Sequence, residues 1–138
     1  RPKAKVTFEK LNPSKYIVRV SNAEEPFNLV FSETFNNKWK VYIKDEKEGS
    51  ILSNLFQKLT GDSRPFETAF KKDLYSESHR QINGYANMWT VDSDNDSFEL
   101  IVEFGTQKVH YVAVLISFTI FISLVSYLIV KILKKSKV

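Results

Sequence analysis

Alternating apolar and polar residues predict six β-strands between residues 5 and 104. A period of two residues is typical of strands that turn one face toward a core. In the last segment, Phe98, Leu100, Val102 and Phe104 recur at every second position and share a face. The predicted strands are Lys5–Leu11, Lys15–Val20, Phe27–Glu33, Lys38–Lys44, Asn87–Val91 and Phe98–Phe104. The third is a nearly continuous apolar run, which we expect of a central strand.

The middle of the chain has a different periodicity. Within residues 50–59, apolar side chains recur at helical spacing, at Leu52, Leu55, Phe56 and Leu59. Ser50 can cap this helix and Gly61 can end it. Residues 63–75 are compatible with a second short helix or with a loop. We therefore predict a short helical insertion, at about residues 45–80, between the fourth and fifth strands.

A membrane span is the strongest single signal in the sequence. Residues 111–130 contain no charged side chain, and twenty helical residues cover about 30 Å, the hydrocarbon thickness of a bilayer. Thr119, Ser123 and Ser126 share one helical face, which suggests a packing seam with other helices. The alternative is that a membrane helix simply tolerates these hydroxyls, and the sequence leaves both open. A helix buried in a soluble protein is the weaker alternative.

The distribution of charge predicts the orientation of this span. Four of the 20 basic residues follow it, and only Lys108 lies close before it. The positive-inside rule then places the C-terminus in the cytoplasm and residues 1–108 outside. A tail anchor that faces the cytosol would need the opposite bias. The other 16 basic residues balance the 16 acidic ones, so the body has no surplus of positive charge and nucleic acid is excluded as a partner.

Together these patterns predict a mainly β fold: an antiparallel, jelly-roll-like β-sandwich with a helical insertion, followed by one transmembrane helix. We expect an extracytoplasmic domain at residues 1–108, a cell-membrane span at 109–131 and a basic cytoplasmic tail at 132–138. The chain begins with Arg1 and shows no signal peptide. Earlier segments would have exported the domain, so we expect the end of a longer protein.

One acidic stretch matches part of a calcium-binding pattern. Asp92, Asp94 and Asp96 alternate, and Glu103 lies eleven residues after the first, which is carboxylate spacing known from calcium loops. However, Ser97 stands at the position of the required glycine, and Glu103 falls inside a predicted strand. A solvated turn is the better interpretation. Calcium is the alternative, and no other cofactor is expected for these residues.

A second group has the residue types of a sugar site. Aromatic faces stack on pyranose rings, and amides, imidazole and guanidinium bond to hydroxyls. The candidates for glycan binding are His79, Arg80, Asn83, Tyr85, Asn87 and Trp89. Several of these have a structural alternative: the Asn83-Gly84 pair indicates a tight turn, Asn87 can satisfy buried backbone, and the polar pair His79 and Arg80 can be plain surface. No catalytic constellation is present in the sequence.

Three segments in a fixed order resemble a known family. PFNLVFSETFNNKWKVYI, HRQINGYANMWTVD and FELIVEFGTQKVHYVAVLISF are similar to the C-terminal β-domain and final helix of polytopic membrane glycosyltransferases of the GT-C class, including YfhO-like proteins. Lys38 and Met88 stand where those proteins frequently have glycine. The resemblance implies a parent that transfers sugar from a lipid-linked donor, with its catalytic carboxylates upstream of these residues.

The function expected from the sequence follows from these features. The chain would be a non-catalytic accessory domain, glycan-binding or structural, and the membrane anchor of a polytopic glycosyltransferase-like protein. Its partners would be membrane lipid, other transmembrane helices of the same parent and a glycan. The alternative is a single-pass module of the cell surface that binds glycan or protein, and a weaker one is a calcium-stabilised adhesion module.

Overall fold

The computed structural model describes residues 3–45, 53–54, 57–58 and 61–136. The chain divides into two compact units, Arg1–Gln107 and Lys108–Val138. The first unit, called the β domain below, contains all seven strands. The second is helical. Each is described by itself.

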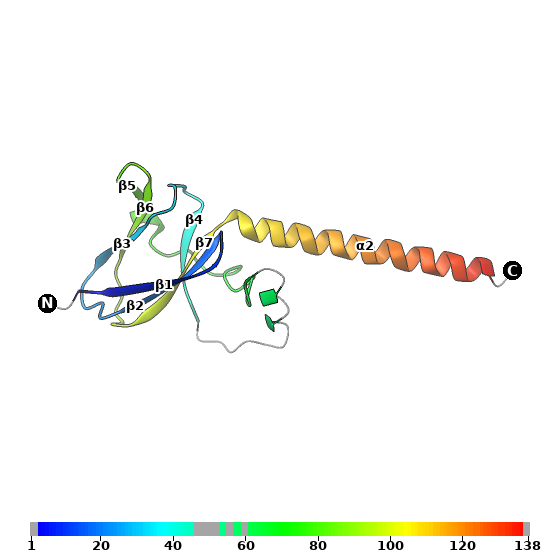
Figure 1. Ribbon diagram of the computed structural model, residues 1–138, viewed down its shortest axis with the longest axis horizontal. Helices are drawn as coiled ribbons and strands as arrows, with labels where there is room; N and C mark the ends of the chain where they lie inside the picture. Colours follow the sequence, from blue (N-terminus) through cyan, green and yellow to red (C-terminus); the bar gives the residue numbers. More distant parts are fainter. Residues whose placement is uncertain (1–2, 46–52, 55–56, 59–60, 137–138) are drawn as a thin grey trace. The chain divides into compact units, whose positions relative to one another are not determined.

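The strands of the β domain form two antiparallel sheets (Figure 1). Their bounds are β1 Lys5–Asn12, β2 Lys15–Ser21, β3 Phe27–Phe31, β4 Trp39–Ile43, β5 Arg80–Ile82, β6 Ala86–Val91 and β7 Phe98–Phe104. The larger sheet has the order β1-β2-β7-β4 and the smaller one β3-β6-β5. Because the chain changes sheet after β2, β3, β4 and β6, strands from both ends of the domain lie side by side. The predicted antiparallel sandwich is confirmed.

All six strands expected from the alternation are present, but two assignments change. The run that begins at Phe27 was expected in the centre of a sheet, and this was wrong: β3 is the edge strand of the smaller sheet. Its apolar run reflects one buried residue, Leu29, and a neighbour, Val30, that remains 44% exposed. The strand β5, only three residues long, was not predicted because so short a segment shows no period.

The two sheets are held together by a core of aromatic and branched side chains. The buried members are Tyr16, Val18, Val20, Ala23, Leu29, Trp39, Val41, Trp89, Val91, Leu100 and Val102. Trp39, the first residue of β4, is 7% exposed. Its ring meets Phe31 and Phe104 edge-on, with centroids 4.8 and 5.1 Å apart, an arrangement that aromatic pairs prefer.

A segment between β4 and η1 (Ser76–Ser78, a 3-10 turn) covers the outer face of the larger sheet. It bonds to three strands of that sheet: Asp62 binds β2, the Thr68 hydroxyl donates to Glu103 on β7, and Leu74 forms a bridge to Val41 on β4. Ile101, on the same outer face, is completely buried. The larger sheet is therefore buried on both faces over its central strands.

The predicted helical insertion is only partly described. Most of residues 50–59, including Leu52, Leu55, Phe56 and Leu59, lie outside the described residues, while 53–54 and 57–58 are helical. Residues 61–75 contain turns rather than a second helix, with i to i+3 backbone bonds such as that from Ala69 N–H to Phe66 O at 3.0 Å. Gly61 has a φ of 72°, and a Cβ there would lie 2.8 Å from Leu11 O, so this turn requires glycine.

A buried ammonium group ties this segment to β2. Lys15 is 1% exposed, and its Nζ lies 2.7 Å from Asp62 Oδ2 and 2.7 Å from Glu67 Oε1. It also donates to the Arg64 carbonyl at 3.0 Å. All three N–H groups of the ammonium are thereby satisfied inside the protein. The burial of a charge is tolerated because both the charge and its donors are matched.

The second unit is the helix α2, Thr106–Ser136. Its stretch from Lys108 to Lys135 is long and apolar enough to cross a membrane, and none of the side chains in its most apolar window is buried. Ser117, Thr119 and Ser123 each donate a hydrogen bond of 2.9 Å to the carbonyl four residues earlier. These hydroxyls therefore need no partner from lipid.

Replacing Lys15 tests whether the buried charges stabilise the β domain. Lys15→Ala leaves two carboxylates buried without their cation, so we expect a loss of about 3–5 kcal/mol in the free energy of unfolding. The measurement is a urea titration of the chain in detergent micelles, followed by tryptophan fluorescence. Both tryptophans, Trp39 and Trp89, lie in the core of the β domain, so the signal reports on that domain.

Lys72→Ala, at an exposed position of the same unit, is the matched control and should leave the transition in place. A Lys15→Ala transition that coincides with that of Lys72→Ala would contradict the structural role of the buried cluster.

Candidate functional site

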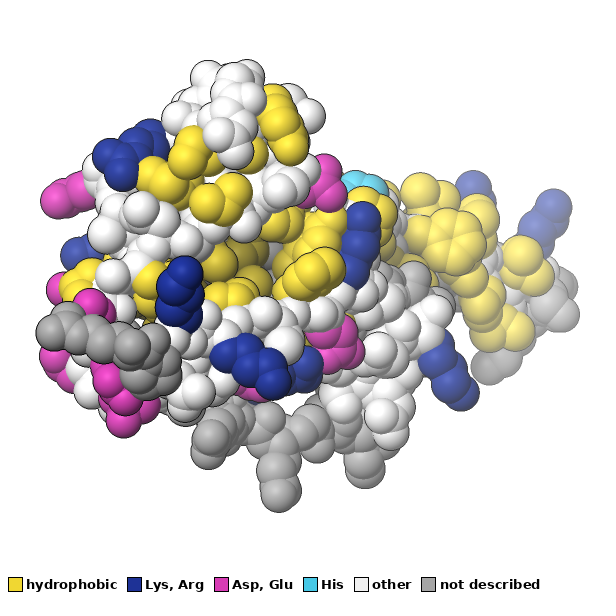
Figure 2. Space-filling view, turned by 60° about the vertical axis from the view of Figure 1, so that its left-hand side comes forward, with side chains coloured by type: hydrophobic (Ala, Val, Ile, Leu, Met, Phe, Trp, Pro, Cys, Tyr) yellow, Lys and Arg dark blue, Asp and Glu magenta, His cyan; other side chains and the backbone are white. Residues whose placement is uncertain are grey.

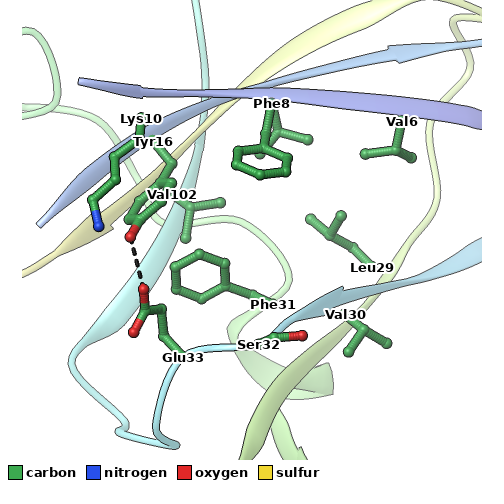
Figure 3. Close-up of a pocket in the computed structure, with 11 residues that line it drawn as sticks. Val6, Phe8, Lys10, Tyr16, Leu29, Val30, Phe31, Ser32, Glu33 and Val102 are labelled. Atoms are coloured by element: carbon green, nitrogen blue, oxygen red, sulfur yellow. Dashed lines mark hydrogen bonds between the residues drawn. The ribbon is translucent and has the colours of Figure 1, made fainter. Parts of the chain in front are cut away.

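An apolar groove opens on one side of the sandwich, between the edge strands β1 and β3 (Figure 3). It has a volume of about 450 Å³. Val6 and Phe8 project from β1 toward it, while Leu29 and Phe31 line it from β3. The groove exists because β1 extends the larger sheet beyond the edge of the smaller one, so the inner face of β1 has no strand opposite it.

Polar groups gather at one end of this groove. The Tyr16 hydroxyl donates a hydrogen bond of 2.8 Å to Glu33 Oε1, and Lys10 Nζ lies 5.2 Å from the centre of the Tyr16 ring. A hydrogen bond to the Tyr16 side chain raises the pKa of Lys10. The groove thus joins an apolar floor to an end that has one cation, one carboxylate and a hydroxyl.

Exposure of large apolar side chains marks this face as a contact surface. Phe8 is 72% exposed and Val6 is 40% exposed. Figure 2 shows hydrophobic side chains gathered in a hollow on one face of the β domain, with basic side chains at its border. An apolar patch framed by polar groups is typical of a binding surface. It can accept an apolar or aromatic group and contains no arrangement suited to bond cleavage.

The sequence did not predict this groove. Alternation placed Val6 and Phe8 on one face of a strand, and such a face is normally assigned to a core. That this strand lies at an edge is decided by pairing with residues far along the chain, which the local pattern does not contain. The signal that could have indicated it is the charge on the opposite face, at Lys5 and Glu9, since edge strands often carry such residues.

The candidate glycan residues are distributed over both the surface and the core. Asn87 and Trp89 are 0% and 1% exposed. The Asn87 amide donates to Glu33 O at 2.8 Å, and its Oδ1 accepts from Asn36 N–H at 3.2 Å. His79 stacks on Trp89 with centroids 4.5 Å apart. These contacts match the structural alternative for Asn87, and Trp89 is part of the core.

The other candidates lie on the hairpin that joins β5 to β6. Asn83 and Gly84 have φ values of 53° and 77°, the backbone expected from the predicted tight turn. Tyr85 is 51% exposed and Arg80 is also exposed. Glycan binding stays a prediction; Arg80, Asn83 and Tyr85 are exposed in this structure, and His79 is partly exposed.

The acidic candidates remain apart. Asp92, Asp94 and Asp96 are all exposed in the turn between β6 and β7. The Asp92 carbonyl accepts from the Tyr75 hydroxyl at 2.9 Å and the Asp96 carbonyl accepts from Ala23 N–H at 2.9 Å. Among the described residues, no group of three His, Cys, Asp or Glu side chains is placed to hold a metal ion. The calcium interpretation is unsupported here.

Among the ionisable groups of the β domain with shifted pKa values, His79 and Glu99 are both lowered, but for different causes. Burial against Trp89 lowers the pKa of His79, and the hydrogen bond to Asn87, 3.0 Å long, opposes this effect. Lys40 adds a smaller lowering. The pKa of Glu99 is also lowered, chiefly because Lys44 bonds to it and Arg19 adds a second bond.

Comparison with known proteins adds no relative. No protein-family model, no curated protein and no solved structure matches this chain. The class of protein is therefore argued from the sequence and the geometry alone.

The lowered pKa of His79 predicts a loss of stability in mild acid. The neutral ring is the form that the folded state accommodates, so the unfolded chain binds the proton more readily. The contribution of neutral His79 to the free energy of unfolding is complete above 6.5, the ordinary pKa of histidine. This contribution is lost as the pH falls from there through the lower pKa that His79 has in the folded state. We expect the urea midpoint, followed by tryptophan fluorescence, to decrease between about pH 7 and pH 5.5.

The two histidines of the chain supply the control for this measurement. His79→Gln should remove most of the decrease, while His110→Gln should retain it. A midpoint that is constant over this range in the unaltered chain would show that His79 does not couple protonation to folding.

Proposed function

We propose that this chain is the extracytoplasmic accessory domain and membrane anchor at the C-terminal end of a polytopic, glycosyltransferase-like membrane protein. The observation that carries the proposal is the succession of β7 and α2. Only Gly105 separates the last strand from a helix that is long and apolar enough to span a bilayer. This order of a sandwich and then a span is the order implied by the sequence resemblance.

The charges at the two ends of α2 support the proposed orientation. Lys131, Lys134 and Lys135 belong to its last turns, whereas Lys108 is the single lysine in its first turn. A cluster of lysines on the cytoplasmic side would place the β domain outside. The internal bonding of Ser117, Thr119 and Ser123 supports the insertion itself, because these three hydroxyls donate to the helix backbone instead of facing hydrocarbon without a partner.

The location of the resembling segments supports an accessory rather than catalytic role. The most specific pieces are the LVFSE run at residues 29–33 with the following Trp39, and the NGYANMW run at residues 83–89; they lie largely in β3, β4 and β6, and both tryptophans are buried in the core. What these segments share with the family would then be the sandwich itself. A rigid sandwich that covers or braces a membrane portion is consistent with that. An acceptor glycan would then contact the exposed side chains of Tyr85, Arg80 and Asn83.

The apolar groove favours the second candidate, a single-pass surface module that binds a ligand through its sandwich. It presents an exposed aromatic ring, Phe8, and a polar end at Lys10 and Glu33. Under this second candidate function, α2 would still be the membrane anchor and the β domain would still lie outside the cell. The whole protein, however, would be much smaller and would have no further spans.

The orientation can be tested with single cysteines, because the 138 residues contain none. In the native membrane, with any cysteines elsewhere in the parent replaced, Ser97→Cys lies in an exposed turn of the β domain. Lys135→Cys lies at the opposite end of the candidate span. We expect a membrane-impermeant maleimide to label Ser97→Cys in intact cells and Lys135→Cys only after permeabilisation.

Labelling of both sites after permeabilisation confirms that each is reactive and serves as the control. The reverse pattern, with Lys135→Cys labelled in intact cells, would overturn the orientation and favour an anchor that faces the cytosol.

A further inference from the structure

The outer edge of β1 is the longest sheet edge that the described residues leave open. Four strands lie at sheet edges: β1, β3, β4 and β5. The edge of β4 is met by the bridge from Leu74 to Val41, and β5 has only three residues. The strand β1 has eight, and its register with β2 is regular from Lys5 to Lys10. Open edges of this length are templates for pairing with another strand.

The side chains of β1 suit a partner that buries apolar groups on one face only. Val6 and Phe8 point toward the groove (Figure 3), and Phe8 is 72% exposed. Lys5, Thr7 and Glu9 lie on the opposite face of the strand and are exposed. No other strand of the described structure carries so exposed a phenylalanine on the rim of a cavity.

The sequence of this edge is complementary to itself when it is read in the opposite direction. If two copies of β1 pair antiparallel with Thr7 facing Thr7, Lys5 of each copy lies opposite Glu9 of the other. Val6 then lies opposite Phe8, on the groove face. Residues that are directly opposite in an antiparallel pair lie on the same face, with Cβ atoms about 4.5–5.5 Å apart. Charge and shape are therefore matched by one register.

We infer that two copies of this chain associate through β1, antiparallel about a two-fold axis at Thr7. The two four-stranded sheets would join into one sheet that is continuous across the interface. An interface of this kind is isologous, because each contact occurs twice. The exposed Phe8 of each copy would cover Val6 of the other and close the open side of the groove. This inference does not depend on the proposed function.

The acidic partner in this pairing is already positioned by the fold. Arg19 bonds Glu9 Oε2 at 2.8 Å and Glu99 Oε1 at 2.8 Å, which holds Glu9 on the outer face of the sheet. The bond shown for the Glu9 carboxylate uses Oε2, and among the described residues none is shown for its other oxygen, Oε1. Lys5 of a second copy would bond there. Cross-strand ion pairs of this type contribute modestly each, and the two-fold axis doubles them.

Cysteine cross-linking of the full chain in detergent micelles tests the register directly. Thr7→Cys would place two thiols opposite each other at the axis, within reach of a disulfide after mild oxidation. Lys10→Cys, on the same strand, would place its two thiols about 20 Å apart. We expect a covalent dimer with Thr7→Cys and little with Lys10→Cys.

Charge reversal tests the contacts that select this register. In a Thr7→Cys background, Lys5→Glu sets like charges opposite each other, and we expect the dissociation constant to rise about tenfold. The double variant Lys5→Glu with Glu9→Lys restores opposite charges and should recover cross-linking. Light scattering of the cysteine-free chain should give the mass of two copies in addition to bound detergent.

Three results would overturn the inference. The first is a monomeric mass at micromolar concentration. The second is equal cross-linking of Thr7→Cys and Lys10→Cys, which would indicate random collision. The third is a dimer whose mass and cross-linking yield are unchanged by Lys5→Glu. This result is expected if the two copies associate through α2 instead. Tryptophan fluorescence confirms in each case that the variant β domain is folded.

Discussion

The strand β7 is the constraint on which the rest of this structure depends. It pairs with β2 on one side and β4 on the other, so the larger sheet exists only through it. Leu100 and Val102 face the smaller sheet, and Ile101 and Glu103 face the segment that covers the sheet from outside. All four are at most 1% exposed. The chain then passes directly into α2.

Gly105, at the end of β7, shows how closely this exit is packed. Its N–H donates to Lys38 O at 2.8 Å, and a Cβ would lie 3.3 Å from the same oxygen. The strand order therefore has two outcomes. It leaves β1 and β3 as edge strands with the groove between them, and it makes a central strand of the larger sheet the one that leads to the candidate span.

Much of the fold could be predicted from the sequence, because alternation is a local property. Six strands and the turn at Asn83 follow from neighbouring residues. Contacts between distant segments could not be predicted in this way. Lys15 lies on the polar side of its strand in sequence, yet it is buried because residues 47 positions away supply a carboxylate. The groove was missed for the same reason, because it depends on which strands lie at the edges.

The central claim is that this β domain and span are one part of a larger membrane protein. The most direct measurement is the intact mass of the native polypeptide, extracted from membranes. A mass several times the 16.0 kDa of these residues is the result we expect, because it leaves room for further spans and catalytic loops. A mass near 16 kDa with only a leader peptide added would contradict the account and support the single-pass binding module.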